Sequence, residues 1–159
     1  IEGLAYRGHK VETLADKASF EEVAYLLLYD KLPNKSELSE YKALLKSQRD
    51  LPQALKEVLQ KIPASAHPMD VMRTGTSMLG NLEPEGDFSN QLNSINRMIA
   101  TMASIDTYWY KYSHEGEDIS LVNDEDSMAG HFLHILHGKT PSDLHRKVMD
   151  VSLVLYAED

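Results

Sequence analysis

Cysteine is absent from the 159 residues of this sequence. The chain therefore has no disulfide framework and no thiol nucleophile, which fits a reducing compartment and predicts a cytoplasmic protein. No apolar run approaches the roughly 18 residues of a transmembrane helix, so no membrane span is expected. Glycine loops that cradle phosphates, of the GxGxxG or GxxxxGKS/T type, are also missing, as is the GxSxG nucleophile elbow. These absences exclude several common kinds of site.

Basic residues are few and scattered. The chain holds 16 Lys and Arg against 25 Asp and Glu, which gives a formal net charge of −9. A nucleic-acid surface or an anionic membrane surface needs clustered Lys and Arg to displace counterions, so we expect neither partner. Hydrophobic residues make up 42% and charged residues 26% of the sequence, which is the composition of an ordinary folded domain.

Helical signals dominate after a short N-terminal stretch. Ile1 to Thr13 alternates loosely around Arg7-Gly8 and is expected to form a short strand pair or an extended arm. Beyond it, capping residues and prolines open helices that carry apolar residues at helical spacing. Two expected helices begin at Ser19 and at Asn34, and the last one begins at Asp143. The others are expected to run from Pro52 to Ile62, from Met69 to Leu82, from Asn90 to Tyr112 and from Ser127 to Gly138. The pattern predicts an all-α, multi-helical domain of irregular architecture.

Small residues interrupt the helix from Met69 to Leu82. Gly75, Ser77 and Gly80 lie between its apolar residues, although a glycine inside a helix costs about 1 kcal/mol relative to alanine. A frayed helix is one interpretation. We favour the other, in which the small residues let a second helix approach closely.

Three further clusters are candidate sites. His131 and His134 can share a helix face, whereas His137 lies about 60° further round, and no carboxylate completes a His-Glu-x-x-His motif. We expect no metal site there and interpret these histidines as structural.

The aromatic run Tyr108 to Tyr112 could stack on bases or sugars, but the acidic charge of the chain favours its interpretation as the end of an aromatic core. Asn123 to Asp126 lacks the pattern of a calcium loop and is expected to belong to a helix cap.

The last helix shows no stop signal, because neither Gly nor Pro follows Pro141. A packed helix normally ends in a cap, most often with Gly just beyond. We therefore expect that the chain is interrupted at Asp159 rather than finished. The apolar residues that share one face of this helix are Leu144, Val148, Val151 and Leu155.

Four passages, in this order and spacing, make the sequence similar to the citrate synthase family, and nearest to its 2-methylcitrate synthase branch. They are Tyr6-Arg-Gly8, Phe20-Glu-Glu-Val-Ala-Tyr-Leu-Leu-Leu28 with Leu32-Pro33, His67-Pro-Met-Asp-Val-Met-Arg-Thr-Gly75, and Gly130-His-Phe-Leu-His-Ile-Leu-His-Gly138. The stretch from Met149 to Glu158 extends the match. The resemblance covers nearly the whole chain.

The resemblance implies a multi-helical large domain, of which residues 1–159 form the front part; the small domain and the C-terminal part lie outside this chain. It also implies a homodimer in which the segments 51–63 and 68–82 pack against the partner. The interface residues that it implies are Met69, Met72, Gly75, Thr76 and Leu79.

The implied activity is that of an acyltransferase that condenses propionyl-CoA with oxaloacetate and water to give 2-methylcitrate and CoA, as part of propionate catabolism. The CoA thioester is then a substrate, and no cofactor is implied. In the family, a carboxylate removes a proton from the acyl α-carbon while one His stabilises the enol and a second assists attack on the ketone. The motifs that carry these groups have no counterpart here, so we expect no catalytic residue within this chain and no activity from it alone.

One position is implied as a substrate ligand. Asp159 stands where the family usually has a His that contacts oxaloacetate, although a carboxylate would repel that dicarboxylate. Arg7 and Arg73 are candidate anion ligands, but structural ion pairing is the favoured interpretation for both. His67 is expected to position the start of the helix that follows it.

Two alternative functions remain open at this point. The first is a citrate synthase that uses acetyl-CoA in the tricarboxylic acid cycle. The second belongs to another class, a non-catalytic helical module that dimerises through residues 68–82.

Overall fold

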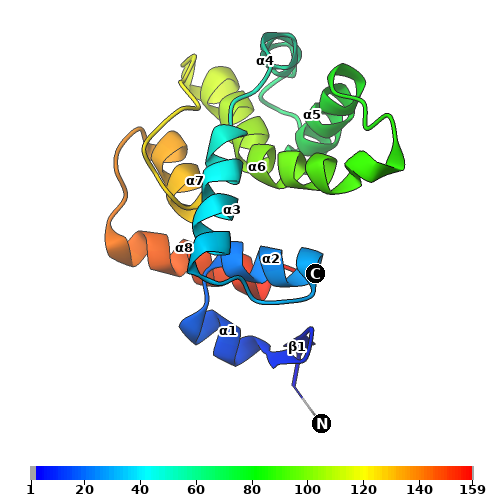
Figure 1. Cartoon of the computed structure of the whole chain (residues 1–159). Coiled ribbons are helices and arrows are strands. Elements are labelled where there is room, and N and C mark those ends of the chain that lie inside the picture. Colours follow the sequence, from blue (N-terminus) through cyan, green and yellow to red (C-terminus); the bar gives the residue numbers. More distant parts are fainter. Residues whose placement is uncertain (1–2, 159) are drawn as a thin grey trace.

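The computed structural model describes residues 3–158, and helices dominate its regular structure (Figure 1). A short antiparallel hairpin pairs β1 (Ala5–Tyr6) with β2 (His9–Lys10). The α-helices are α1 (Val11–Lys17), α2 (Phe20–Tyr29), α3 (Lys35–Ser47), α4 (Gln53–Gln60), α5 (Pro68–Leu82), α6 (Gln91–Tyr110), α7 (Met128–His137) and α8 (Asp143–Leu155). A 3-10 turn, η1 (Phe88–Asn90), precedes α6, and a π-helical turn, η2 (Lys111–Glu115), follows it. The predicted all-α class and the N-terminal strand pair are both confirmed.

Four of the predicted helix starts are confirmed at the level of single hydrogen bonds. Ser19 forms a full capping box with the third helical residue of α2, and Asn34 does the same for α3. Ser127 accepts the backbone N–H of Gly130 at the start of α7. Ser142 caps α8 in the same way. Each cap satisfies one of the backbone donors that the first turn of a helix leaves without a partner.

Two boundaries differ from the prediction. Val11 to Thr13 does not continue the extended stretch but forms the first turn of α1, because Val11 and Leu14 lie three residues apart and both bury their side chains. The helix expected to reach Tyr112 keeps α-helical geometry only to Tyr110 and then widens into η2. A left-handed Gly116, with φ of 70°, ends that turn.

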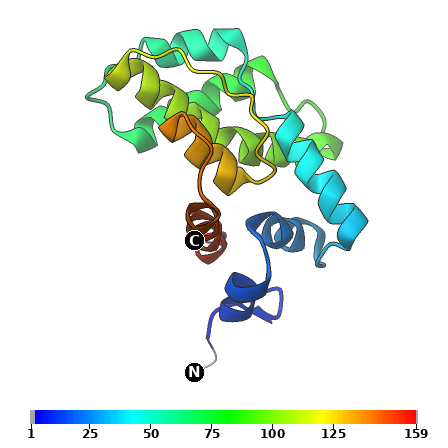
Figure 2. The same ribbon diagram turned by 90° about the vertical axis from the view of Figure 1, so that its left-hand side faces the viewer.

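The helices form two groups joined by α3 and α7 (Figures 1 and 2). In one group α4 and α5 pack against α6, around buried residues that include Leu55, Val71 and Ile105. In the other group α1 and α2 pack against α8, with Tyr6 and Val154 in the buried cluster between them. No helix within residues 3–158 is long and apolar enough to cross a membrane.

Helix α8 turns its apolar stripe outward. The exposed fraction is 70% for Leu144 and 58% for Val148, whereas Val154, about 90° round the helix from the centre of that stripe, is completely buried against α1 and α2. The stripe noted in the sequence is therefore not the side that this chain buries. The amphipathic pattern identified the helix correctly but could not say which surface covers its apolar face.

Candidate functional site

The predicted substrate position, Asp159, falls outside the described residues, but the segment that leads to it from α8 is defined. The α-helix ends at Leu155, and Tyr156 N–H still bonds to the carbonyl of Ser152 at 3.2 Å. The Leu155 carbonyl accepts a hydrogen bond from the Tyr6 hydroxyl at 3.0 Å. The end of α8 is therefore hydrogen-bonded to a residue near the other end of the sequence.

The two candidate anion-binding arginines are already paired. Arg7 Nε lies 3.1 Å from a carboxylate oxygen of Asp30, and a second guanidinium nitrogen donates to the Leu27 carbonyl at 3.2 Å. Arg73 pairs with Asp70 one helical turn away, at 2.7 Å. These contacts support the structural interpretation of both arginines.

The three histidines of α7 are placed in different surroundings. His131 is fully buried, His134 is half-buried and His137 is exposed at the end of the helix. Burial, followed by the charges of Arg49 and His134, lowers the pKa of His131 to about 3. His131 is therefore neutral at physiological pH.

Hydrogen bonds define the tautomer of His131. Asn123 Oδ1 accepts the backbone N–H of Glu125 at 3.0 Å, so its amide nitrogen is the group that donates to His131 Nδ1, at 2.9 Å. His131 Nε2 consequently carries the proton and donates to the Ser104 hydroxyl at 3.0 Å. This histidine joins α7 to α6 and to the loop before α7, as a structural side chain.

His134 faces a carboxylate that already has a stronger partner. The Nδ1 atom of His134 lies 3.5 Å from Glu125 Oε1. The guanidinium of Arg146 on α8 donates hydrogen bonds to both Glu125 oxygens, at 2.8 and 2.9 Å. The Arg146 guanidinium, more than His134, holds the pKa of Glu125 below its usual range. Among the described residues no group of three or more histidines and carboxylates is arranged to hold a metal ion.

The implied interface residues of α5 fall into two groups, one buried within the chain and one exposed or half-buried at its surface. Gly75 and Leu79 are buried within the chain, where Gly75 lies directly against Ile105 of α6. Met69 is 68% exposed, and Met72 and Thr76 are half-buried. The close approach inferred from the small residues is real at Gly75, but the neighbouring helix belongs to the same chain. Of the five implied residues, Met69, Met72 and Thr76 keep exposed surface in this chain, and the interface itself stays a prediction.

His67 has the role expected of it. Its Nδ1 accepts the backbone N–H of Met69 at 3.2 Å, and Pro68 follows in the first turn, where the missing N–H costs nothing. His67 is thus an N-cap of α5.

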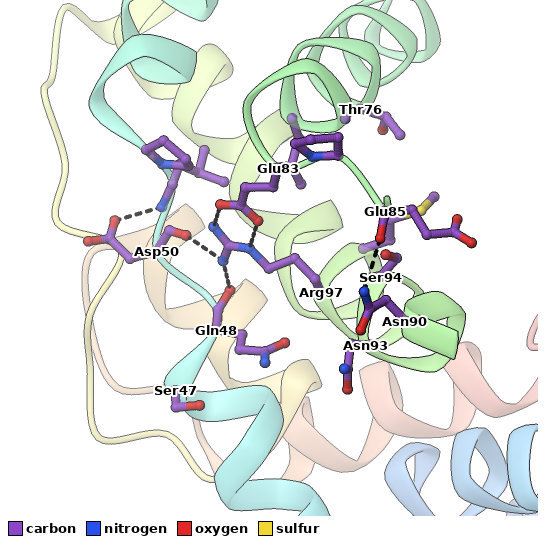
Figure 3. Close-up of a pocket in the computed structure, with 16 residues that line it drawn as sticks. Ser47, Gln48, Asp50, Thr76, Glu83, Glu85, Asn90, Asn93, Ser94 and Arg97 are labelled. Carbon is purple, nitrogen blue, oxygen red and sulfur yellow. Dashed lines mark hydrogen bonds and ion pairs between the residues drawn. The ribbon is translucent and has the colours of Figure 1, made fainter. Parts of the chain in front are cut away.

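A cleft of about 830 Å³ lies where the end of α5 and the start of α6 meet the α3–α4 connection. Figure 3 shows Arg97 at its centre, bound to both carboxylate oxygens of Glu83 at 2.8 Å. Arg97 also donates to the carbonyls of Asp50, at 2.9 Å, and of Gln48. Because these four bonds occupy its guanidinium, Arg97 joins three segments and is not a free anion ligand.

Sequence reasoning missed the Arg97–Glu83 pair. The two residues are separated by a loop, so no helical spacing links them, and their contact depends on how α5 and α6 pack.

Comparison with known proteins gives a consistent result. The family model described as citrate synthase, C-terminal domain, matches residues 1–159. A 2-methylcitrate synthase of Shewanella oneidensis is 61% identical over 156 residues, which is 98% of this chain and 42% of that protein.

Solved structures agree on the fold. The citrate synthase of Thermotoga maritima superposes with a TM-score of 0.81 at 30% identity, over 99% of this chain and 40% of its own. That of Thermoplasma acidophilum, solved as a ternary complex with carboxymethyl coenzyme A and oxaloacetate, reaches 0.87 at 24% identity, over 98% of this chain and 42% of its own. The chain thus spans about two fifths of the length of these relatives. It belongs to the citrate synthase family.

Proposed function

We propose that the protein of which this chain is part condenses propionyl-CoA with oxaloacetate and water to give 2-methylcitrate and CoA. The observation that carries the proposal is the 61% identity to a 2-methylcitrate synthase across 98% of this chain. The reaction places the protein in propionate catabolism, and the lack of cysteine supports a cytoplasmic location.

Within that enzyme these residues act as scaffold. His131 is held neutral and hydrogen-bonded at both ring nitrogens, and Glu125 is bound by Arg146, so neither is available as an acid or base. The groups that remove the α-proton and stabilise the enol lie in the part of the enzyme outside this chain. The 159 residues alone are expected to be inactive. No metal or cofactor is proposed, since the thioester is itself a substrate.

The test is turnover by the full-length enzyme. Release of CoA from propionyl-CoA and from acetyl-CoA is measured with a thiol reagent at saturating oxaloacetate, and each reaction without oxaloacetate is the blank. We expect kcat/KM to be larger for propionyl-CoA, with 2-methylcitrate as the product by mass spectrometry. Absence of oxaloacetate-dependent CoA release would overturn the proposal.

A citrate synthase that prefers acetyl-CoA is the second candidate. It is supported by the likeness to the Thermotoga maritima enzyme at 30% identity. The same assay separates the two, because the order of the two kcat/KM values reverses. The preference between the two thioesters depends on the shape of the pocket for the acyl chain, because one methylene group in a hydrophobic pocket changes the discrimination between substrates by about 1–3 kcal/mol.

We also propose that the enzyme is a homodimer and that α5 contributes to its interface. Met69 and Met72 on α5 and Met98 on α6 are exposed or half-buried in this chain. Thr76 of α5 is also half-buried, and its hydroxyl lies 3.9 Å from the sulfur of Met102 on α6. Adaptable methionine side chains beside small residues form a surface that a second helix pair can approach closely.

A further inference from the structure

Helix α8 makes its side-chain hydrogen bonds to other elements through polar residues. Arg146 donates to both oxygens of the Glu125 carboxylate. An Asp150 oxygen accepts the backbone N–H of Phe20 at 3.1 Å. Val154 is the one buried residue among the thirteen described residues of the helix. A surface helix normally does the reverse, because its apolar side faces the core and its polar side faces water.

The apolar side chains of α8 form one stripe at the surface of this chain. Leu144 and Val148 are mostly exposed, Leu155 is 45% exposed and Val151 is half-buried. Their spacing of four, three and four residues places them within about 60° of one another around the helix and along roughly 16 Å of its length. Apolar side chains gathered in this way mark a surface that another segment covers.

Most of a protein of this family lies outside these 159 residues. The chain spans 42% of the length of the Shewanella oneidensis relative, so more than half of a protein of that length is available to cover the stripe. Removal of four neighbouring apolar side chains from water is favourable, because the hydrophobic effect scales with the apolar area that is buried.

A second copy of the chain is a less suitable occupant. A two-fold dimer is built from one patch that is the same on both subunits, and the interface proposed above uses α5. Helix α5 packs with α4 and α6, whereas α8 packs with α1 and α2 in the other helix group (Figures 1 and 2). A transient partner fits less well, since such interfaces are only about as apolar as the rest of a protein surface.

We propose that the apolar stripe of α8 is an internal surface of the complete protein, covered by an apolar segment of the same polypeptide that lies outside residues 1–159. Helix α8 is then a middle layer, with α1 and α2 on one side and that segment on another. The inference goes beyond the proposed reaction, because it concerns the folded polypeptide whether or not that reaction is catalysed.

The test uses the full-length protein and measures access to single cysteines. Val148→Cys places a small thiol in the middle of the stripe. His145→Cys is the matched control, because His145 is exposed and lies on the same helix about 90° from the centre of the stripe. Reaction with a maleimide is followed by mass spectrometry of the peptide that carries the substitution, which separates it from any cysteine elsewhere. We expect Val148→Cys to react at least about tenfold more slowly than His145→Cys, and at a similar rate in urea.

Val148→Ala gives a second readout, in which the sign of the effect decides. Alanine has the higher helix propensity, so the substitution raises the Tm if the side chain at position 148 faces water. If a segment covers the stripe, the substitution leaves a cavity, and we expect the Tm of the full-length protein to fall by about 2–5 °C.

Three results would overturn the inference. The first is equal reaction rates of Val148→Cys and His145→Cys in the folded protein, and the second is a rise in Tm with Val148→Ala. The third is protection of position 148 that disappears when the protein is diluted to monomers, because a second copy would then cover the stripe. If Val148→Cys does not fold, Leu144→Cys replaces it in the same comparison.

Discussion

The side chain of Ile105 on α6 fills the space that a β-carbon on Gly75 of α5 would need. The two helices therefore approach closely within one chain. We predict that Gly75→Ala lowers the free energy of unfolding by about 1–3 kcal/mol, because the added methyl must displace a branched side chain in a packed core. Urea denaturation measures the effect.

Gly80→Ala is the internal control for this prediction. Gly80 lies in the same helix, but nothing comes within 4 Å of the position that its β-carbon would take. We expect this substitution to raise stability by about 0.5–1 kcal/mol, from helix propensity alone. Equal effects of the two substitutions would contradict the packing described for Gly75.

The second prediction concerns association of the full-length enzyme. Met69 is 68% exposed, so its replacement removes almost no contact within this chain. We predict that Met69→Glu converts the dimer to a monomer, because two copies of a carboxylate would be desolvated in the interface. Sedimentation analysis gives the oligomeric state, and Val122→Glu, which alters another exposed apolar residue, should leave it unchanged. A dimer that survives Met69→Glu would exclude this face of α5 from the interface.

The third prediction concerns the joint between α8 and the loop before α7. Glu125 is 8% exposed and accepts two hydrogen bonds from Arg146. We predict that Arg146→Met lowers the Tm clearly, because it leaves a carboxylate enclosed without its cation. Asp143→Asn removes only the fully exposed partner of Arg146 and should change the Tm little. A comparable drop in both variants would contradict the role given to Glu125.

The same pair has a defined pH dependence. The pKa of Glu125 is lowered in the folded chain, so its contribution to stability is present above the ordinary glutamate value of 4.5 and is lost as the pH falls through the folded value. The difference in Tm between wild type and Arg146→Met should therefore shrink at acidic pH.

Local features of this fold could be predicted from the sequence because they depend on neighbours in the chain. Ser19, Asn34, Ser127 and Ser142 cap helices through residues three positions away, which a sequence displays directly. Helix α1 escaped prediction because seven residues with only two buried apolar side chains give a weak periodic signal.

Long-range relationships could not be predicted in the same way. Glu21 Oε1 accepts the backbone N–H of Met128 at 2.7 Å across 107 positions, and burial raises the pKa of that glutamate. Nothing in the sequence around Glu21 marks it as buried. Likewise, the small residues of α5 indicated close packing but not which helix would pack against Gly75. The candidate substrate segment was identified by family resemblance, whereas its attachment to Tyr6 required the structure.

That attachment also constrains the order of events during synthesis. Tyr6 and Leu155 are 149 positions apart, and a ribosome that adds about 5–20 residues per second separates their appearance by roughly 7 to 30 s. Arg7 meets the carbonyl of Leu27 after only 20 further residues. The hairpin can therefore pack against α2 early in synthesis, whereas the hydrogen bond from Tyr6 to the Leu155 carbonyl can form only when α8 is complete. Closure of the helix end by Tyr6 is thus a late event in the folding of this part of the chain.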